Sequence, residues 1–300
     1  MKRRHFIQLA AASLPAAIIP FERVIAGNKE QTNVLPPKVK ISLNAYSFNR
    51  PLMAGEMNID NMLDFAAQTG FEGVDLTGYY FPGYPAVPSD EYIYHVKRLA
   101  FKLGIEICGT GVRNDFTLHD ASSRTAEKKL VKDWIEVASK LGAQTVRIFA
   151  GGTGAPTGYT WEQTADWIAD DIRECAEYGR RNGVMVALQN HWDFIKTADH
   201  VLDLFQKINF DWVGLMLDIG SFRSADPFAE IEKTIPLAIT WQVKEEMYIN
   251  NQPVKTDLNR LKKIIDASAY RGYLPIETLG AGDPKQKISA MYQEVRKIFG

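Results

Sequence analysis

The chain has 300 residues, of which 46% are hydrophobic and 24% are charged, as in ordinary globular proteins. Its formal net charge is −1, and no long basic run follows the N-terminus, which argues against binding to nucleic acid. Two cysteines, Cys108 and Cys175, are too few for a disulfide framework, and we expect both to be buried thiols.

The N-terminus has the pattern of an export signal. A basic start that includes Arg3 and Arg4 precedes an apolar stretch too short for a membrane span, and small residues then lead to Ala26. The arginine pair resembles a twin-arginine signal, so we predict export to the periplasm, a signal peptide over 1–26 and a linker over 27–38. An uncleaved apolar segment lying at the membrane interface is the alternative. Cleavage would leave a net charge of −4 and no stable membrane insertion.

A repeated pattern then runs to the C-terminus: a helix-like segment ends in glycine, and a short apolar run follows at once. Glycine just past a helix end is the left-handed cap that releases the chain into a strand. The glycines are Gly70, Gly104, Gly142, Gly183 and Gly272. With three further apolar runs, this predicts eight strands between Val39 and Glu277, each followed by a helix.

Eight strand–helix units in about 260 residues match the size of one (β/α)₈ barrel. The strands are apolar on both faces, as parallel strands covered by helices should be. A doubly wound open sheet is the alternative, but the first turn, "AYSFNRPL", lacks the glycine-rich phosphate-binding fingerprint. We therefore predict a single TIM barrel over 39–300.

In such a barrel the active site forms at the C-terminal ends of the strands. Four consecutive strands deliver an oxygen-bearing side chain there, at similar distances along each apolar run: Gln189, Asp218, Gln242 and Glu277. Carboxylate and amide oxygens suit a hard divalent cation. The alternative is a buried hydrogen-bonded cluster without metal, for which Lys244 is the local candidate to compensate the carboxylates.

The same strand ends carry a resemblance to the xylose isomerase-like TIM barrels, a family that includes sugar phosphate isomerases and epimerases. The matching stretches are "VALQNH", "LMLDIGSF", "WQVKE" and "GYLPIETLG", and the resemblance extends from about Val39 to the C-terminus. The family pattern at these ends is approximately Glu-Asn-His, Asp, His-x-Lys-Asp and Glu. It places the metal ligands at Gln189, Asp218, Gln242 and Glu277, while Asn190, His191 and Lys244 match unchanged.

Two ligand positions depart from the family pattern, and each departure changes the expected chemistry. Family epimerases use two metal-bound glutamates, one to remove a proton and one to return it. Here the first is Gln189, and an amide cannot act as a base. Gln242 replaces a histidine, which makes the protein ligands all-oxygen, favours Mn²⁺, Mg²⁺ or Ca²⁺ over Zn²⁺ and weakens binding.

The remaining candidate residues follow from their places at the predicted barrel mouth. Glu277 is the first choice of catalytic base, and His191 or Lys244 is the second proton carrier. Arg147 or Arg113 could instead pair with Asp75 inside the barrel. The predicted substrate-binding residues are Asn44, Tyr46, Arg147, Asn190, Trp192 and Phe222.

Together these features predict a divalent-metal-dependent isomerase or epimerase that removes a proton next to a sugar carbonyl. A lyase or hydratase acting on 3-keto-glycosides would use the same enolate and needs no second carboxylate. A catalytically inactive sugar-binding barrel is the third alternative. A phosphodiesterase is excluded because the chain has neither the histidine cluster nor a basic groove. The expected partner is a small carbohydrate, and the sequence is compatible with an oligomer.

Overall fold

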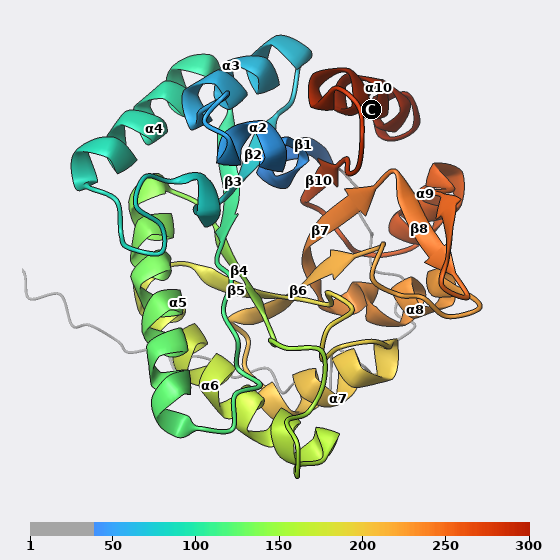
Figure 1. Cartoon of the computed structure of the whole chain (residues 1–300). Coiled ribbons are helices and arrows are strands. Elements are labelled where there is room, and N and C mark those ends of the chain that lie inside the picture. Colours follow the sequence, from blue (N-terminus) through green and yellow to red (C-terminus); the bar gives the residue numbers. More distant parts are fainter. Residues whose placement is uncertain (1–38) are drawn as a thin grey trace, which may run out of the picture. The chain divides into compact units, whose positions relative to one another are not determined.

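All eight predicted apolar runs form strands, and the strands close into a parallel barrel. The structure is a computed structural model that describes residues 39–300, so the predicted signal and linker lie outside the described residues. Helices surround the barrel as an outer ring (Figure 1). The prediction of a (β/α)₈ TIM barrel is confirmed.

The barrel strands follow the chain in order, except that a hairpin separates the seventh from the last. They are β1 (Lys40–Asn44), β2 (Gly73–Thr77), β3 (Glu106–Gly111), β4 (Thr145–Phe149), β5 (Met185–Gln189), β6 (Val213–Asp218), β7 (Ala238–Lys244) and β10 (Tyr273–Glu277). Barrel closure is made by β1, which pairs with β10 on one side and with β2 on the other. The first and last strands are thus neighbours, which brings their C-terminal residues to one part of the mouth.

Helices of varied length connect the strands and form the outer ring. They are α2 (Asn49–Met53), α3 (Ile59–Thr69), α4 (Asp90–Leu103), α5 (Ala121–Leu141), α6 (Trp161–Asn182), α7 (Ala198–Ile208), α8 (Pro227–Thr234), α9 (Leu258–Asp266) and α10 (Pro284–Phe299). Short 3₁₀ turns lie at Ala45–Phe48 (η1), Gly78–Tyr80 (η2) and Ile235–Leu237 (η3). No helix within 39–300 is long and apolar enough to cross a membrane.

Glycine caps end four helices as predicted, and the fifth predicted cap is wrong. Gly70, Gly104, Gly142 and Gly183 all have positive φ and follow α3, α4, α5 and α6. Helix α9 instead ends before Ala267, five residues ahead of Gly272. A side chain at Gly272 would lie 2.9 Å from the hydroxyl of Tyr270, so close packing explains this glycine.

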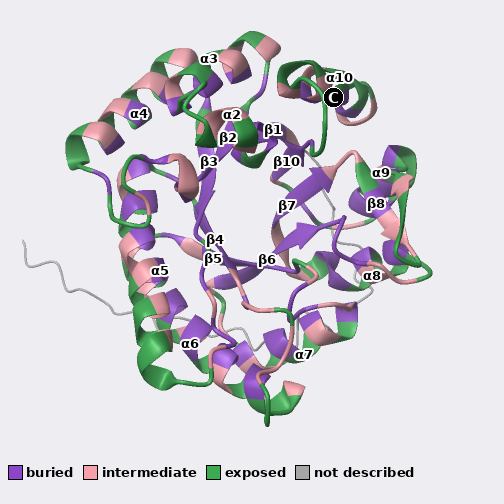
Figure 2. Ribbon diagram, in the orientation of Figure 1, coloured by how far each residue is buried: buried purple, intermediate pink, exposed green. Residues whose placement is uncertain are grey.

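Burial follows the layers of the barrel. Figure 2 shows the barrel strands buried and the helices buried on their inner faces only, as two-sided covering of a parallel sheet requires. Both cysteines are buried free thiols, Cys108 in β3 and Cys175 in α6, which confirms the prediction made for them.

A β-hairpin that the sequence pattern did not predict follows β7. It pairs β8 (Glu246–Ile249) with β9 (Gln252–Lys255) in antiparallel fashion. Asn250 and Asn251 form its two-residue turn with φ of 49° and 63°, as asparagine does in hairpin turns with positive φ. The hairpin adds Tyr248 and Lys255 to the wall of the cavity described below.

Candidate active site

A cavity of about 1500 Å³ is lined by residues at the C-terminal ends of the barrel strands and in the loops that follow them. This is the end of the barrel at which active sites are built. Most of the predicted site residues line it. They are Asn44, Tyr46, Arg147, Gln189, His191, Trp192, Gln242, Lys244 and Glu277.

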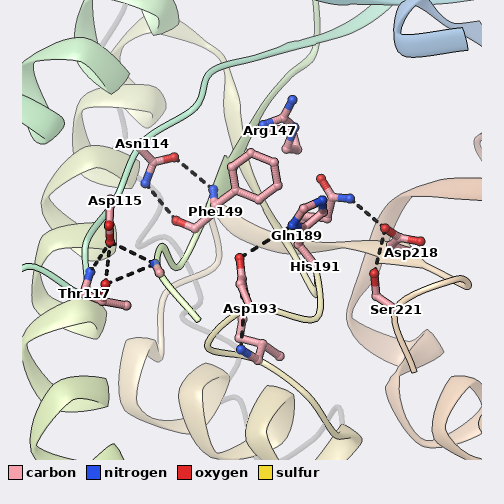
Figure 3. Close-up of polar contacts among 12 residues, drawn as sticks. Asn114, Asp115, Thr117, Arg147, Phe149, Gln189, His191, Asp193, Asp218 and Ser221 are labelled. Carbon is pink, nitrogen blue, oxygen red and sulfur yellow. Dashed lines mark hydrogen bonds and ion pairs between the residues drawn. The ribbon is translucent and has the colours of Figure 1, made fainter. Parts of the chain in front are cut away.

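The four predicted metal-ligand positions converge into one hydrogen-bonded cluster. Gln189 Nε2 donates to Asp218 Oδ2 at 2.8 Å and to Gln242 Oε1 at 2.5 Å. Gln242 Nε2 in turn donates to Glu277 Oε2. Figure 3 shows Gln189 directed at Asp218, which Ser221 also contacts. The two amides therefore link the two carboxylates across four consecutive strands of the barrel, β5, β6, β7 and β10.

Lys244 supplies the positive charge of this cluster. Its Nζ lies 2.9 Å from Asp218 Oδ2 and 3.6 Å from Glu277 Oε1. Asp218 is fully buried and Glu277 is 2% exposed, so neither carboxylate is compensated by bulk water. The ammonium therefore lies against both carboxylates, the role that the metal-free alternative requires.

The pKa values of the three charged groups follow from burial and mutual attraction. Burial alone would raise the pKa of Asp218, but Lys244 and the hydrogen bonds outweigh it and hold that pKa below its usual value. For Glu277 burial prevails over Lys244, and the pKa is raised. Burial would lower the pKa of Lys244, but the two carboxylates raise it above its usual range.

As folded, the four side chains do not present a free set of oxygen ligands to a divalent ion. The ammonium of Lys244 lies against both carboxylates, and amide nitrogens of Gln189 and Gln242 face acceptor oxygens. Among residues 39–300, no group of three or more His, Cys, Asp or Glu side chains is placed to hold a metal. The divalent ion stays a prediction of the sequence, and the chemistry proposed below takes no step through it.

His191, Asn190 and Phe222 have different surroundings despite their common prediction as site residues. The His191 ring lies half-exposed in the cavity, 4.6 Å from the ring of Phe149. Its partial burial, aided by nearby cations, outweighs the attraction of Asp218 and lowers its pKa to about 4. Asn190 is fully buried and its amide bonds both backbone groups of Asp218. Phe222 is also fully buried. Neither Asn190 nor Phe222 lines the cavity, so Asn190 positions Asp218 and Phe222 packs in the core.

The expected ion pair between Asp75 and an arginine does not form. Arg147 instead donates to the hydroxyl of Tyr79 at 3.1 Å and to the carbonyl of Val112 at 2.5 Å, and its guanidinium lies over the Phe149 ring. Asp75 remains 4% exposed at the end of β2. Burial is the main reason that its pKa is raised to about 7, with Arg147 lowering it and Glu277 raising it further.

This raised pKa predicts how stability changes with pH. An acid whose pKa is higher in the folded state binds its proton more tightly there, so Asp75 favours folding at low pH. The advantage is lost as pH rises from about 4 to about 7, by at most roughly 4 kcal/mol for this shift. Denaturant unfolding of wild type and Asp75→Asn should therefore show the variant gaining stability relative to wild type across that range. A difference that stays constant from pH 4 to 8 would contradict the shift.

Two loops on one wall of the cavity are tied together by side chains. Asn114, after β3, donates to the backbone carbonyl of Phe149 at 2.8 Å and accepts from its N–H at 2.9 Å (Figure 3). Asp115 accepts from the backbone of Gly152, in the loop after β4, at 3.0 Å. The wall beneath Arg147 and His191 is thus held by hydrogen bonds to backbone atoms.

Arg223 is a cavity residue that the sequence analysis missed. Its guanidinium lies 5.0 Å from the ring centre of Trp192 and 4.3 Å from that of Tyr248. Its Nε is buried and has no hydrogen-bond partner within the described chain. Arginine between aromatic rings is typical of cation–π contact. The only available signal was its place in "GSFRS", five residues after Asp218, whereas the partner Tyr248 comes from the unpredicted hairpin.

A closed (β/α)₈ barrel with a polar, carboxylate-containing cavity at the C-terminal strand ends has the architecture of a barrel enzyme. The chain belongs to the xylose isomerase-like TIM barrel family, whose model matches residues 63–297. The family predicted from the sequence is thereby confirmed. No curated protein matches the chain.

Solved structures of similar fold share little sequence with it. D-psicose 3-epimerase from Clostridium cellulolyticum H10, solved with D-tagatose, is 14% identical with a TM-score of 0.70 and covers 87% of this chain and 99% of its own. The 3-keto-D-glucoside 4-epimerase YcjR from E. coli is 15% identical with a TM-score of 0.70, covering 87% and 100%. A probable 3-DHS dehydratase from Bacillus anthracis is 17% identical with a TM-score of 0.65, covering 86% and 99%. At these identities the likeness concerns the fold.

Proposed function

We propose that the protein is an enzyme that removes a proton from the carbon next to a carbonyl group of a carbohydrate. The observation that carries this proposal is the cluster of Glu277, Lys244 and two amides on the cavity wall. A carboxylate can accept the proton, and nearby N–H donors can stabilise the negative oxygen that forms. Isomerases, epimerases and lyases that act through an enolate begin with this step.

In the proposed reaction Glu277 is the base and Lys244 is the electrophile. Lys244 carries a fixed positive charge within the cluster, so it can hydrogen-bond a substrate carbonyl oxygen as that oxygen becomes an enolate. Asp218 holds the ammonium in place through the 2.9 Å contact. Gln189 and Gln242 orient the two carboxylates and do not exchange protons.

Carbohydrate as the substrate class is supported by the family and by the cavity walls. Trp192 and Tyr248 offer aromatic faces, and Arg223 between them offers hydrogen-bond donors. The structural neighbours named above act on D-psicose and on a 3-keto-D-glucoside, which are sugars with a carbonyl group. Because we predict export, unphosphorylated sugars are the substrates of choice.

The test is to incubate the protein with D-fructose, D-tagatose, a 3-keto-glucoside and a hexuronate in D₂O. The hexuronate is included because Arg223 makes no ion pair with an acid within residues 39–300. Proton NMR follows the loss of the C–H signal next to each carbonyl, and product analysis follows the reaction type. We expect exchange with at least one sugar, and release of an aglycone would identify a lyase. Binding without exchange for every sugar would identify a binding protein and contradict the proposal.

A further inference from the structure

Asp75 shares one level of the barrel with Glu277. In the strand register Asn44 of β1 lies opposite Asp75 of β2, and Leu43 lies opposite Ile276 of β10. The next residue of β10 after Ile276 is Glu277, so Glu277, Asn44 and Asp75 form a row across three adjacent strands. All three line the cavity. Adjacent strands are about 4.8 Å apart, so the backbones that carry the two carboxyl groups are separated by roughly 10 Å.

The carboxyl group of Asp75 has no partner among the residues that the structure describes. Within residues 39–300 it takes part in no hydrogen bond and no ion pair, although the side chain is 4% exposed. A buried carboxyl group normally acquires such partners, because its burial costs free energy without them. Arg147, the arginine that lowers the pKa of Asp75, donates from Nη1 to Tyr79 and Val112 and forms no ion pair with Asp75. The group therefore faces the cavity with its oxygens free.

Glycines on β3 keep the space beside Asp75 open. Gly109 lies opposite Asp75 in the register, and a side chain there would approach Asp75 Oδ1 to 3.4 Å and Thr145 Oγ1 to 2.8 Å. A side chain at Gly111 would meet Arg147 Nε at 2.9 Å. Burial, with Glu277 raising and Arg147 lowering its pKa, brings that pKa to about 7, so both protonation states are populated near neutral pH.

We propose that Asp75 is the second proton-transfer residue of the reaction that Glu277 begins, and that it supplies the acid that Gln189 cannot provide. This inference rests on the proposed function. With Asp75 in this role, the enzyme is an epimerase. The substrate is then a keto sugar, and the product is its epimer at a carbon next to the carbonyl. The sequence alone predicts for Asp75 only an ion pair with an arginine.

The two steps balance without an oxidant or a co-reactant. The Glu277 carboxylate takes the proton, and the electron pair of the broken C–H bond forms the enolate. The Asp75 carboxylic acid then gives its proton to the same carbon from the other side, and the enolate pair forms the new C–H bond. Glu277 ends as the acid and Asp75 as the carboxylate. Both exchange with water through the cavity before the next turnover.

The experiment separates proton removal from proton return. Wild type and Asp75→Asn are incubated in D₂O with the panel sugar that exchanges fastest, and NMR measures both deuterium in recovered substrate and the amount of epimer. For Asp75→Asn we expect epimer formation to fall by about 100-fold or more, while substrate exchange stays within about threefold of wild type. Glu277→Gln should lose both.

The control is Asp171→Asn, which changes a buried aspartate of the outer ring that pairs with Arg124 and Lys128. It should leave the ratio of epimer to exchange as in wild type. Asp75→Asn that forms epimer at the wild-type rate, or that loses exchange and epimer equally while folded, would overturn the role of Asp75 alone. Wild type that binds the sugars and exchanges none would overturn the proposed function and this role together.

Discussion

Replacing Lys244 by methionine lowers the free energy of unfolding by about 3–5 kcal/mol, the cost of removing one partner from a buried ion pair. The reason is that Asp218 and Glu277, both buried, then lose the ammonium that lies 2.9 and 3.6 Å from them. Equilibrium unfolding in urea at neutral pH measures the change. Methionine keeps most of the volume of the lysine chain, so the loss reports the missing charge.

Lys129→Met is the matched control, because Lys129 pairs with Asp133 on the exposed surface of α5. An exposed pair of this kind contributes at most about 1 kcal/mol. Equal losses in the two variants would contradict the role of Lys244 as the internal cation.

Wild type and Lys244→Met together also test the predicted divalent ion. If Lys244 compensates the carboxylates, millimolar Mn²⁺ should leave the Tm of wild type unchanged and raise that of Lys244→Met. In that variant the ammonium no longer lies against Asp218 and Glu277, so carboxylate oxygens become available to a hard cation. A rise in the Tm of wild type would show instead that the ion predicted from the sequence binds in the presence of Lys244.

Replacing Glu277 by glutamine lowers the rate of α-proton exchange by about 10²–10⁴-fold, the usual contribution of a positioned general base. The amide has the shape of the carboxylate and can still bond Gln242, but it cannot accept the proton. The measurement is deuterium uptake into the exchanging sugar, with circular dichroism and sugar affinity as checks on folding.

Glu106→Gln makes the same chemical change at the other end of the barrel, where Glu106 begins β3 and pairs with Lys40. Exchange by this control should match wild type. A Glu277→Gln protein that is folded, binds the sugar and exchanges at the wild-type rate would remove Glu277 as the base.

The barrel could be predicted because its signals are local. The glycine caps Gly70, Gly104, Gly142 and Gly183 each end a helix two or three residues before a barrel strand begins, so both features lie within a few positions of sequence. The hairpin from Glu246 to Lys255 was missed because it lies outside the strand–helix rhythm. Its only signal in the sequence is the Asn-Asn turn, and two residues are too few to show a period.

The sequence predicts which residues form the site more completely than it predicts the hydrogen bonds between them. Parallel strands bring their C-terminal residues together, so the convergence of Gln189, Asp218, Gln242 and Glu277 followed from their spacing. Which amide donates to which acid depends on side-chain rotamers, and these do not follow from strand spacing. Likewise, the free carboxyl group of Asp75 arises because Arg147 turns to Tyr79 and Val112, a choice made by packing across the barrel.

The most direct test of this account is α-proton exchange by wild type that has been dialysed against a chelator. Proton NMR in D₂O would follow the sugar C–H next to the carbonyl, with Glu277→Gln as the blank. We predict that the signal of at least one sugar disappears with wild type and persists with the variant. Exchange that is absent after dialysis and returns on adding Mn²⁺ would contradict it, because the cation assisting the enolate would then be a bound metal rather than Lys244.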